Sequence, residues 1–271
     1  MTMRPELSGV PETTLWTLHN RATEARRPDG GLHDPWAVAA LEALSYPYAE
    51  RFGRPNQIHA LRARCFDAAL RSFLDTRPGA RVVALGEGLQ TTYWRLGEPD
   101  VDWYSVDLPE VLDLRRRLLP PADRVHPLAL SALDRTWMDA VGTDPPTPTI
   151  VTAEGLLMYF VRDQVVGLLR DLATRFPGGA LIFDTIPPWF SRRTLRGLDL
   201  TPAYRAPAMP WGIRVPDVLA LPREVPRLAG VDDLGLPPGR GFFRRPVIRA
   251  VSALPVLGAQ RPGLFRARFA T

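Results

Sequence analysis

Two glycines and an acid about 20 residues further on are the residues of this sequence best suited to bind a ligand. Gly86 and Gly88 follow the apolar run 82–85, and Asp107 ends the next short apolar run. Glycines after a buried strand let the backbone turn sharply and approach a ligand closely. An acid at the end of the second strand is placed to bind ribose hydroxyls. The pattern predicts an α/β fold with an adenosine-containing ligand.

What the glycine turn lacks narrows the choice of ligand. A dinucleotide fingerprint needs a third glycine where this chain has Thr91, and a Walker-type loop needs a lysine, which this chain does not contain. Binding of phosphates is therefore disfavoured, and a phosphate-free nucleoside such as S-adenosylmethionine fits better. Alternatively, the two glycines serve only a tight strand-to-helix turn and bind no ligand. With Asp107 at the expected distance, ligand binding and this purely structural role are about equally supported.

The elements that must position these residues fall into two patterns. Residues 10–75 have helical periodicity, with Asp34 as the N-cap and Pro35 at the first position of one helix. Residues 81–184 alternate between strand and helix patterns. The expected strands are 81–85, 102–106, 124–128, 149–153 and 180–184, and the expected helices are 110–119, 134–141 and 162–176. This alternation predicts a mostly parallel, doubly wound sheet.

Beyond residue 186 the regular pattern is replaced by proline-rich, arginine-rich and aromatic segments, followed by two late candidate strands, 247–252 and 264–269. So long an irregular segment after the fifth strand is more typical of a substrate lid than of a disordered linker. The expected organisation is one domain over 1–271. Its parts are a helical cap (1–78), a cofactor-binding core (79–185), a lid (186–246) and C-terminal strands (247–271).

Composition excludes several functional classes. The 271 residues carry a net charge of +5, but the basic residues are spread beside 29 acids rather than clustered with aromatics, so nucleic-acid binding is disfavoured. No stretch approaches the about 18 apolar residues of a membrane span, and we expect a cytoplasmic protein. One cysteine and four scattered histidines do not indicate a metal site. His19 and His33 are the histidines best placed for a base. The oligomeric state is left open.

Six segments occur in order along the chain: ETTLWTLHNRATEARRPDGGLHDPWA, LRARCFDAALRSFL, VVALGEGLQTTYWRLGEPDVDWYSVDLPEV, SALDRTWMDAV, TAEGLLMYF and FPGGALIFDTIPPWFSRRTLRGL. Taken together they resemble the leucine carboxyl methyltransferase family, and within it the bacterial tetracenomycin-type O-methyltransferases of polyketide metabolism. The resemblance covers most of the chain. It implies a class I S-adenosylmethionine-dependent methyltransferase fold, Rossmann-like, with a seven-stranded, mostly parallel sheet.

The resemblance also implies roles for individual residues. Arg62 matches an arginine that pairs with the methionyl carboxylate of S-adenosylmethionine, a role that suits the forked guanidinium. Gly86 matches the glycine of the cofactor loop, and Gly88 allows the same close approach. Asp107 matches the acid that binds the ribose hydroxyls. Glu154, at the end of the fourth expected strand, matches a glutamate beside the cofactor.

The chain departs from the family pattern at three places. Ser131 and Ala132 stand where members with leucine-carboxyl activity have an Asp-Leu pair near the adenine, and a serine can hydrogen-bond the adenine without charge. The cofactor loop carries Glu87 and Gln90 where an Asp is common. Eukaryotic members supply a lysine from the first helix, for which Arg21 could substitute here, although a surface position on the helix is favoured for that arginine.

The chemistry that follows is methyl transfer from a sulfonium, an in-line displacement in which the protein contributes mainly positioning and desolvation. A carboxylate acceptor needs no base, whereas a phenol benefits from one. Arg192 and Arg196, which share a helix face, are candidates to bind an anionic acceptor, together with Arg193. Tyr159 and Tyr204 are candidate acceptor contacts. A solvated lid surface and simple packing are the alternative interpretations for these arginines and tyrosines.

The sequence therefore predicts an S-adenosylmethionine-dependent O-methyltransferase acting on a carboxylate or phenolic hydroxyl of a small molecule, such as a polyketide or another secondary metabolite. An enclosed apolar pocket under Trp189 and Trp211 would favour this interpretation. Methylation of a protein C-terminus would instead need an open groove, and a non-catalytic cofactor-binding protein would have a blocked acceptor pocket. A nicotinamide oxidoreductase is disfavoured by Thr91.

Overall fold

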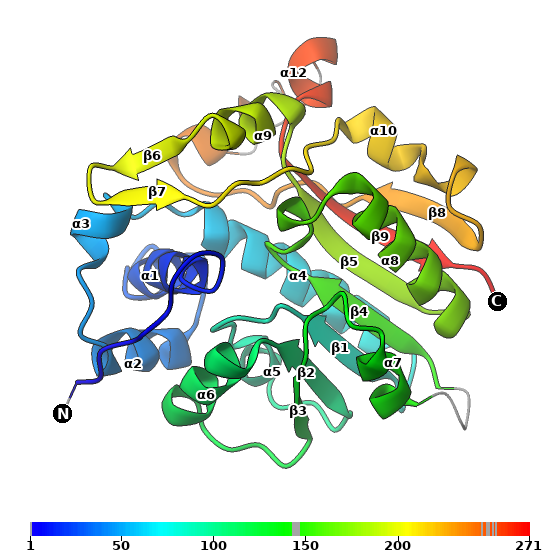
Figure 1. Ribbon diagram of the computed structural model, residues 1–271, viewed down its shortest axis with the longest axis horizontal. Coiled ribbons are helices and arrows are strands. Elements are labelled where there is room, and N and C mark those ends of the chain that lie inside the picture. The colour runs from blue at the N-terminus through cyan, green and yellow to red at the C-terminus, as the bar shows by residue number, and fades with distance from the viewer. Residues whose placement is uncertain (1, 143–146, 245, 248–249, 251, 253) are drawn as a thin grey trace.

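The computed structural model describes residues 2–142, 147–244, 246–247, 250, 252 and 254–271. Its centre is a seven-stranded sheet with helices on both faces (Figure 1). In spatial order the strands are β3 (Val125–Ala129), β2 (Trp103–Asp107), β1 (Arg81–Leu85), β4 (Thr149–Ala153), β5 (Ala180–Thr185), β9 (Gly263–Phe269) and β8 (Leu228–Asp233). β9 runs antiparallel to both of its neighbours, β5 and β8, and the pairs among β1 to β5 are parallel. The expected mostly parallel, doubly wound sheet is confirmed.

Alternating side chains of the central strands enter two separate cores. Val82 and Ala84 of β1 pack with the N-terminal helices, whereas Val83 and Leu85 pack with the helices on the opposite face. Because both faces are covered, a strand such as β5 is buried at every position and shows no polar alternation. The five expected strands agree with β1 to β5 to within one residue at each end.

Helices of the first half form the cap and the crossovers of the sheet. They are α1 (Thr13–Ala25), α2 (Pro35–Ala43), α3 (Tyr48–Phe52), α4 (Ile58–Leu74), α5 (Thr92–Arg95), α6 (Pro109–Leu118), α7 (Thr136–Val141), the 3-10 helix η1 (Leu157–Tyr159) and α8 (Arg162–Arg175). Asp34 caps α2 as expected, accepting a 3.0 Å bond from the backbone N–H of Ala37. Among the described residues no helix combines the length and the apolar character of a membrane span.

The C-terminal third differs from the expectation. It contains α9 (Pro188–Leu195), the hairpin β6 (Leu198–Thr201) and β7 (Tyr204–Ala206), α10 (Val215–Leu219), η2 (Leu221–Arg223), β8, η3 (Gly241–Phe243), α12 (Pro255–Ala259) and β9. The expected lid, 186–246, thus includes an edge strand of the sheet. The expected strand 247–252 falls partly outside the described residues, and the described Val247, Ala250 and Ser252 are helical, so that prediction is wrong.

The β6–β7 hairpin lies against α3 of the cap (Figure 1). Arg51 donates to the carbonyl oxygen of Ala203 at 2.8 Å, and Thr201 donates to the carbonyl of Arg51 at 2.9 Å. The ring of Tyr204 packs edge-on against Phe52, with 4.9 Å between ring centroids. The segment after β5 is therefore tied to the N-terminal helices, and the two close over the carboxyl ends of the strands together.

Candidate active site

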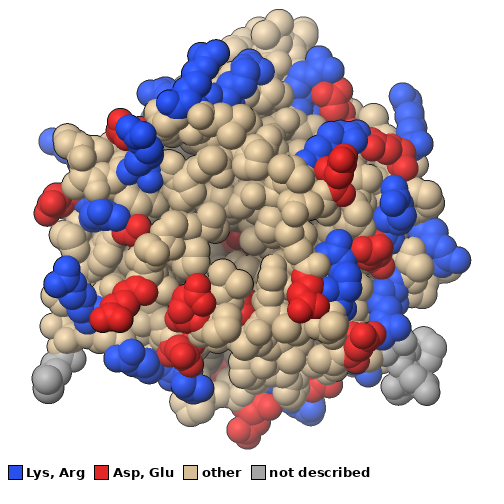
Figure 2. All heavy atoms as spheres, in the orientation of Figure 1, with Lys and Arg blue, Asp and Glu red and all other residues tan. Residues whose placement is uncertain are grey.

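A cavity of about 730 Å³ lies where β1, β2, β4 and β5 end. Ligands of open α/β sheets bind at this edge, where the strand order reverses. The visible face of the molecule is hollowed near its centre (Figure 2). The sequence-predicted residues that line the cavity are Arg62, Gly86, Gly88, Asp107, Ser131, Ala132, Glu154 and Tyr159. The fold thus brings these eight together, while the individual roles assigned to them stay predictions.

The glycine turn after β1 has a backbone that only glycine adopts readily. Gly86 and Gly88 both have φ of 58°. A Cβ atom on Gly86 would lie 2.7 Å from a methyl group of Leu156, and one on Gly88 would lie 2.4 Å from Thr14 Oγ1. Side chains at either position would therefore both strain the backbone and collide with the cavity wall.

The carboxylate of Asp107 is oriented by the backbone around it. Its Oδ2 accepts from the N–H of Gly88 at 2.7 Å, and its Oδ1 accepts from the N–H of Leu108 at 2.8 Å. Burial raises the pKa of Asp107, and these two bonds together with the charge of Arg115 offset only part of the rise. The acid is held at the end of β2 with lone pairs still available to hydroxyl groups.

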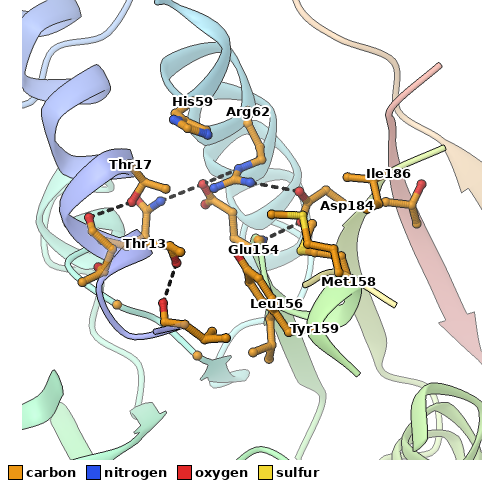
Figure 3. A pocket seen from close by; sticks show the side chains of 18 of the residues that line it. Thr13, Thr17, His59, Arg62, Glu154, Leu156, Met158, Tyr159, Asp184 and Ile186 are labelled. Atoms are coloured by element: carbon orange, nitrogen blue, oxygen red, sulfur yellow. Dashed lines mark hydrogen bonds and ion pairs between the residues drawn. The ribbon is translucent and has the colours of Figure 1, made fainter. Parts of the chain in front are cut away.

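An arginine between two acids forms the floor of the cavity (Figure 3). Arg62 Nε lies 3.0 Å from Glu154 Oε1, and Arg62 Nη1 lies 3.0 Å from Asp184 Oδ2. Gln90 Nε2 donates to Glu154 at 2.7 Å, and the backbone N–H of Gly155 donates to Asp184 at 2.6 Å. No described residue accepts from Arg62 Nη2. The guanidinium is fixed in place with donors left for a ligand.

Burial and charge act in opposite directions on this floor. Burial raises the pKa of Glu154, and the positive charge of Arg62 opposes the rise. Burial would lower the pKa of Arg62, but Asp184 and Glu154 outweigh it and the pKa is raised. The arginine is therefore permanently charged. With both acids ionised, the three side chains carry one net negative charge.

The other side of the cavity is apolar. Met158, Ile186 and Met209 are buried together, and Tyr159 and Phe190 pack against them. All five line the cavity. Met158 and Tyr159 belong to η1, Ile186 directly follows β5, Phe190 lies in α9 and Met209 follows β7. Through Ile186 the wall adjoins Asp184 of the polar floor (Figure 3). The cavity thus combines a polar end and an apolar end, which suits two molecules of different character.

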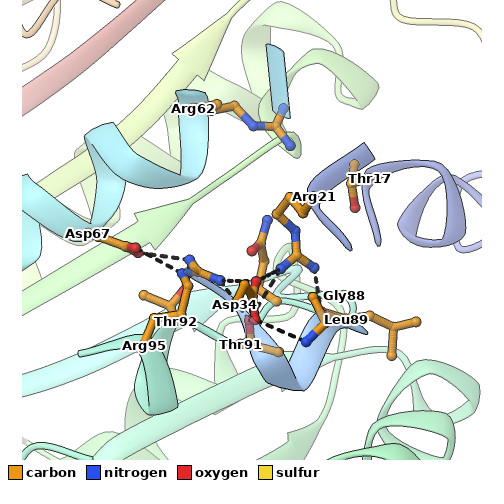
Figure 4. A network of polar contacts seen from close by, with 12 residues as sticks. Thr17, Arg21, Asp34, Arg62, Asp67, Gly88, Leu89, Thr91, Thr92 and Arg95 are labelled. Atoms are coloured by element: carbon orange, nitrogen blue, oxygen red, sulfur yellow. Dashed lines mark hydrogen bonds and ion pairs between the residues drawn. The ribbon is translucent and has the colours of Figure 1, made fainter. Parts of the chain in front are cut away.

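A buried polar network supports the glycine turn from below (Figure 4). Arg21, which is fully buried, pairs with Asp34 at 2.8 Å and donates to the carbonyl of Leu89 at 2.7 Å. Thr91 donates to Asp34 at 2.7 Å, and Arg95 reaches the same carboxylate at 3.1 Å. The network links α1 and the start of α2 to the turn. The turn is therefore positioned by the cap as well as by the sheet.

Arg115 of α6 holds the same turn from its other side. It donates to the carbonyl oxygens of Gly88 and Gln90 at 2.6 and 2.8 Å, and it pairs with the buried Glu87 at 2.9 Å. Glu87 in turn accepts from Ser105 at 2.5 Å. The carbonyl groups of the turn are thus satisfied by arginines.

Comparison with known proteins assigns the family. A sequence model of the leucine carboxyl methyltransferase family matches residues 14–173. The tetracenomycin polyketide synthesis O-methyltransferase TcmP of Streptomyces glaucescens is 33% identical over 225 residues, covering 82% of this chain and 81% of that one. The chain belongs to the leucine carboxyl methyltransferase family.

More distant matches agree with this assignment. The S-adenosyl-L-methionine-dependent methyltransferase dpfgK of Gibberella zeae is 30% identical over 188 residues, covering 63% of this chain and 62% of that protein, so the match spans less than two thirds of it. Among solved structures, the S-adenosylmethionine-dependent methyltransferase SibL in its apo form is similar with a TM-score of 0.50 and 17% identity, covering 98% of this chain and 71% of that one. The expected class I fold is confirmed.

Several predicted residues of this family member lie away from the cavity. Arg192, Arg193 and Arg196 are exposed at the outer face and end of α9, because the helix turns Ser191 and Thr194 inward. They do not line the cavity, and their assignment as acceptor ligands is wrong for this conformation. Figure 2 shows basic side chains over α9 on the outer surface.

Further predicted positions serve packing. Tyr204 is buried against the cap and does not line the cavity, and Arg21 lies beneath the glycine turn rather than in the cavity wall. Trp211 is buried in a core and Trp189 is 47% exposed, so the pocket does not lie under them as expected. Its apolar wall is built by their neighbours instead.

Asp184 and His59 are cavity residues that were not predicted from the sequence. Asp184 is an acid at the carboxyl end of a central strand, the same signal that pointed to Glu154. His59 stands one helical turn before Arg62 on α4 and shares its cavity-facing side. The histidines that were favoured, His19 and His33, do not line the cavity.

Proposed function

We propose that this protein is an S-adenosylmethionine-dependent O-methyltransferase that methylates a carboxylate or phenolic hydroxyl of a small molecule, such as a polyketide or another secondary metabolite. The observation that carries the proposal is the meeting of the predicted cofactor residues and an apolar wall in one cavity of a leucine carboxyl methyltransferase family member. A methyl donor and its acceptor need such adjoining polar and apolar compartments.

The polar end fits the proposed cofactor. Gln90 Oε1 and Thr185 Oγ1 are buried in the cavity lining and have no partner among the described residues, as expected where a polar ligand completes their bonds. The net negative charge of Arg62, Glu154 and Asp184 complements a ligand with a sulfonium and an ammonium group. Asp107 would bind the ribose hydroxyls.

The adenine would lie beside Ser131 and Ala132, which line the cavity after β3. Ser131 Oγ accepts from the backbone N–H of Leu133 at 3.2 Å, which leaves its own hydrogen available to an adenine nitrogen. Arg62 would hold the methionyl carboxylate through Nη2.

When bound, the cofactor supplies a methyl group on a positively charged sulfur. The protein must then hold an acceptor oxygen in line with that group and keep water away. Met158, Ile186, Met209 and Phe190 provide the water-excluding surface. Burial raises the pKa of Tyr159, which therefore stays protonated at neutral pH and contacts the acceptor as a neutral phenol.

Protein C-terminal carboxyl methylation is the alternative suggested by the name of the family. Two observations favour the small molecule. Residues of the C-terminal segment, among them Leu236 and Pro262, also line the cavity, so the acceptor compartment is formed as a cavity. A relative that covers about four fifths of both chains is named for tetracenomycin polyketide synthesis. A non-catalytic protein would have this compartment filled by its own side chains.

Calorimetric titration with S-adenosylhomocysteine, with NADH as the control ligand, tests the cofactor. Binding of the first and not the second is expected, and failure of folded protein to bind S-adenosylhomocysteine would refute the proposal. Methyl transfer from labelled S-adenosylmethionine to phenols, aromatic carboxylic acids and a peptide with a free C-terminal leucine then tests the acceptor. Transfer to the peptide alone would establish the alternative.

A further inference from the structure

His59 lines the cavity from α4 and its ring is held by two neighbours on α1. Its Nδ1 lies 2.8 Å from Asn20 Nδ2, and Trp16 packs edge-on against the ring with 5.2 Å between centroids. Figure 3 shows the imidazole beside the Arg62 side chain. Because the ring orientation is fixed, the chemistry of His59 depends on which nitrogen carries the proton.

The hydrogen-bond chain behind the ring runs in one direction. The backbone N–H of Asn56 donates to Asn20 Oδ1 at 3.2 Å, and a backbone N–H can only donate. Asn20 Nδ2 therefore faces His59, and an amide NH₂ group also can only donate. His59 Nδ1 must accept that bond, which in a neutral imidazole leaves the proton on Nε2.

The surroundings of the ring favour its neutral form. Burial lowers the pKa of His59 well below its usual range, and the positive charges of Arg62 on the same helix and Arg21 on α1 lower it further. None of the described residues accepts a hydrogen bond from Nε2, which lies on the opposite side of the ring from Asn20. His59 thus presents an N–H donor without a lone pair beside the cavity.

The hydroxyl groups near His59 have the opposite polarity. Thr13 and Thr17 each donate to the main-chain carbonyl three residues before, at 2.7 and 3.0 Å, so the single hydrogen of each hydroxyl is already used. These two hydroxyl oxygens offer lone pairs to a ligand, whereas the α4 wall offers hydrogens.

We propose that His59 Nε2–H binds an oxygen of the acceptor molecule and that His59 does not act as a general base. The oxygen is the second oxygen of a carboxylate or a carbonyl oxygen beside a phenolic hydroxyl, which share the same chemistry. This inference rests on the proposed function and adds a specificity determinant to it. An acceptor without such an oxygen leaves a cavity N–H unpaired and is discriminated against.

The tautomer is tested first, by nuclear magnetic resonance of the full chain carrying isotope-labelled histidine. We expect His59 to show a protonated Nε2 and an unprotonated Nδ1 from mildly acidic to mildly alkaline pH, with exposed His33 as the reference imidazole. Asn20→Asp places an acceptor behind Nδ1 and is expected to move a proton there. An Nδ1–H tautomer or an imidazolium in the unmodified protein would overturn the proposal.

Acceptor binding is tested with three flat probes in the presence of S-adenosylhomocysteine. Naphthoate carries a carboxylate, alizarin carries a hydroxyl beside a carbonyl, and naphthol carries a hydroxyl alone. His59→Phe is expected to weaken binding of naphthoate or alizarin roughly three- to tenfold, as for one lost hydrogen bond, while naphthol affinity is unchanged. His59→Gln keeps an N–H donor and should recover part of the loss.

Naphthoate and alizarin distinguish a carboxylate oxygen from a carbonyl oxygen beside a hydroxyl. The probe whose affinity falls in His59→Phe carries the oxygen that His59 binds. Equal affinity of both probes for the variant and the unmodified protein, or no binding of either probe, would overturn the proposal. The affinity for S-adenosylhomocysteine separates this outcome from failure of the proposed function. If the function is wrong, the unmodified protein does not bind S-adenosylhomocysteine, whereas if only this inference is wrong, that binding is intact.

Discussion

Asp34 is the residue that connects the polar network beneath the glycine turn. Replacing it by asparagine measures how much its negative charge contributes to the free energy of unfolding. Its carboxylate, fully buried, receives hydrogen bonds from Arg21, Arg95 and Thr91 (Figure 4). The asparagine side chain would keep an oxygen for the backbone N–H of Ala37, so the cap of α2 survives. The Asp34→Asn change therefore removes the negative charge while leaving the shape and the cap in place.

The expected loss of stability depends on which ion-pair partners Arg21 and Arg95 retain in Asp34→Asn. Arg95 retains Asp67, which it contacts with two bonds of 2.8 Å, but Arg21 loses the carboxylate it is paired with. Leaving one partner of a buried ion pair uncompensated costs about 3–5 kcal/mol. We expect Asp34→Asn to lower the free energy of unfolding by about that amount. Asp67→Asn, at a 15% exposed side chain, is the matched control and should cost about 1–3 kcal/mol.

Urea unfolding followed by circular dichroism measures the change. With a slope of about 3 kcal/mol per molar, the midpoint should fall by roughly 1–1.7 M. The double variant Arg21→Met/Asp34→Asn should recover much of the loss, since it leaves no charge unpaired at this pair. A loss of under about 1 kcal/mol for Asp34→Asn, or no recovery in the double variant, would refute the charge argument.

The same network gives stability a definite dependence on pH. Burial would raise the pKa of Asp34, but Arg21, Arg95 and the bonds from Thr91 and Ala37 outweigh it, so the pKa is lowered. The unfolded chain therefore binds the proton more readily. The contribution of Asp34 is complete above its unfolded pKa and is lost as pH falls through the lower folded pKa, and Asp34→Asn should flatten this acid limb.

The remaining predictions concern the cavity. Arg62→Ala should lower the affinity for S-adenosylhomocysteine at least about tenfold by calorimetry, and unchanged affinity would mean that Arg62 does not hold the cofactor. Asp107→Asn keeps an oxygen for the backbone N–H of Gly88 but loses charge, so a roughly ten- to hundredfold weaker affinity is expected. Gly88→Ala places a carbon 2.4 Å from Thr14 Oγ1 and should both destabilise the protein and weaken this binding. Gly97→Ala, with φ of 87° but nothing within 4 Å, controls for backbone strain alone.

The sheet could be predicted from the sequence where burial determines the pattern. Strands β1, β4 and β5 are covered on both faces, so they are apolar runs between turn residues, and their bounds agree closely with the structure. The edge strand β8, with sequence LAGVDD, has a glycine and two acids and one partly exposed face, so it carries no such signal. Its place in the sheet depends on pairing with β9, far away in the chain.

Site residues could be predicted from the sequence where they follow a strand. They could not be predicted where the answer depends on which side of a helix faces the cavity. Asp107 and Glu154 end parallel strands, so their common edge follows from topology. The helix α9 is polar on more than one side, and its sequence does not distinguish which side is buried. Arg192 and Arg196 do share a face, but it is the exposed one. The direction of the His59 hydrogen bonds depends on Asn20 and on a backbone group that only the fold brings near.

The charges of the cavity explain why its donors matter. Asp107, Glu154 and Asp184 line the cavity together with two arginines, Arg62 on the floor and Arg261, which is paired with Asp233. The floor around Arg62 is therefore net negative among the described residues. Such a floor attracts a cofactor with a sulfonium and an ammonium group, but it repels a carboxylate or phenolate acceptor. An anionic acceptor can therefore approach only where hydrogen-bond donors compensate the repulsion. Since Arg62 Nη2 is assigned to the carboxylate of the cofactor, the Nε2–H of His59, one helical turn earlier on α4, is the donor positioned to do so.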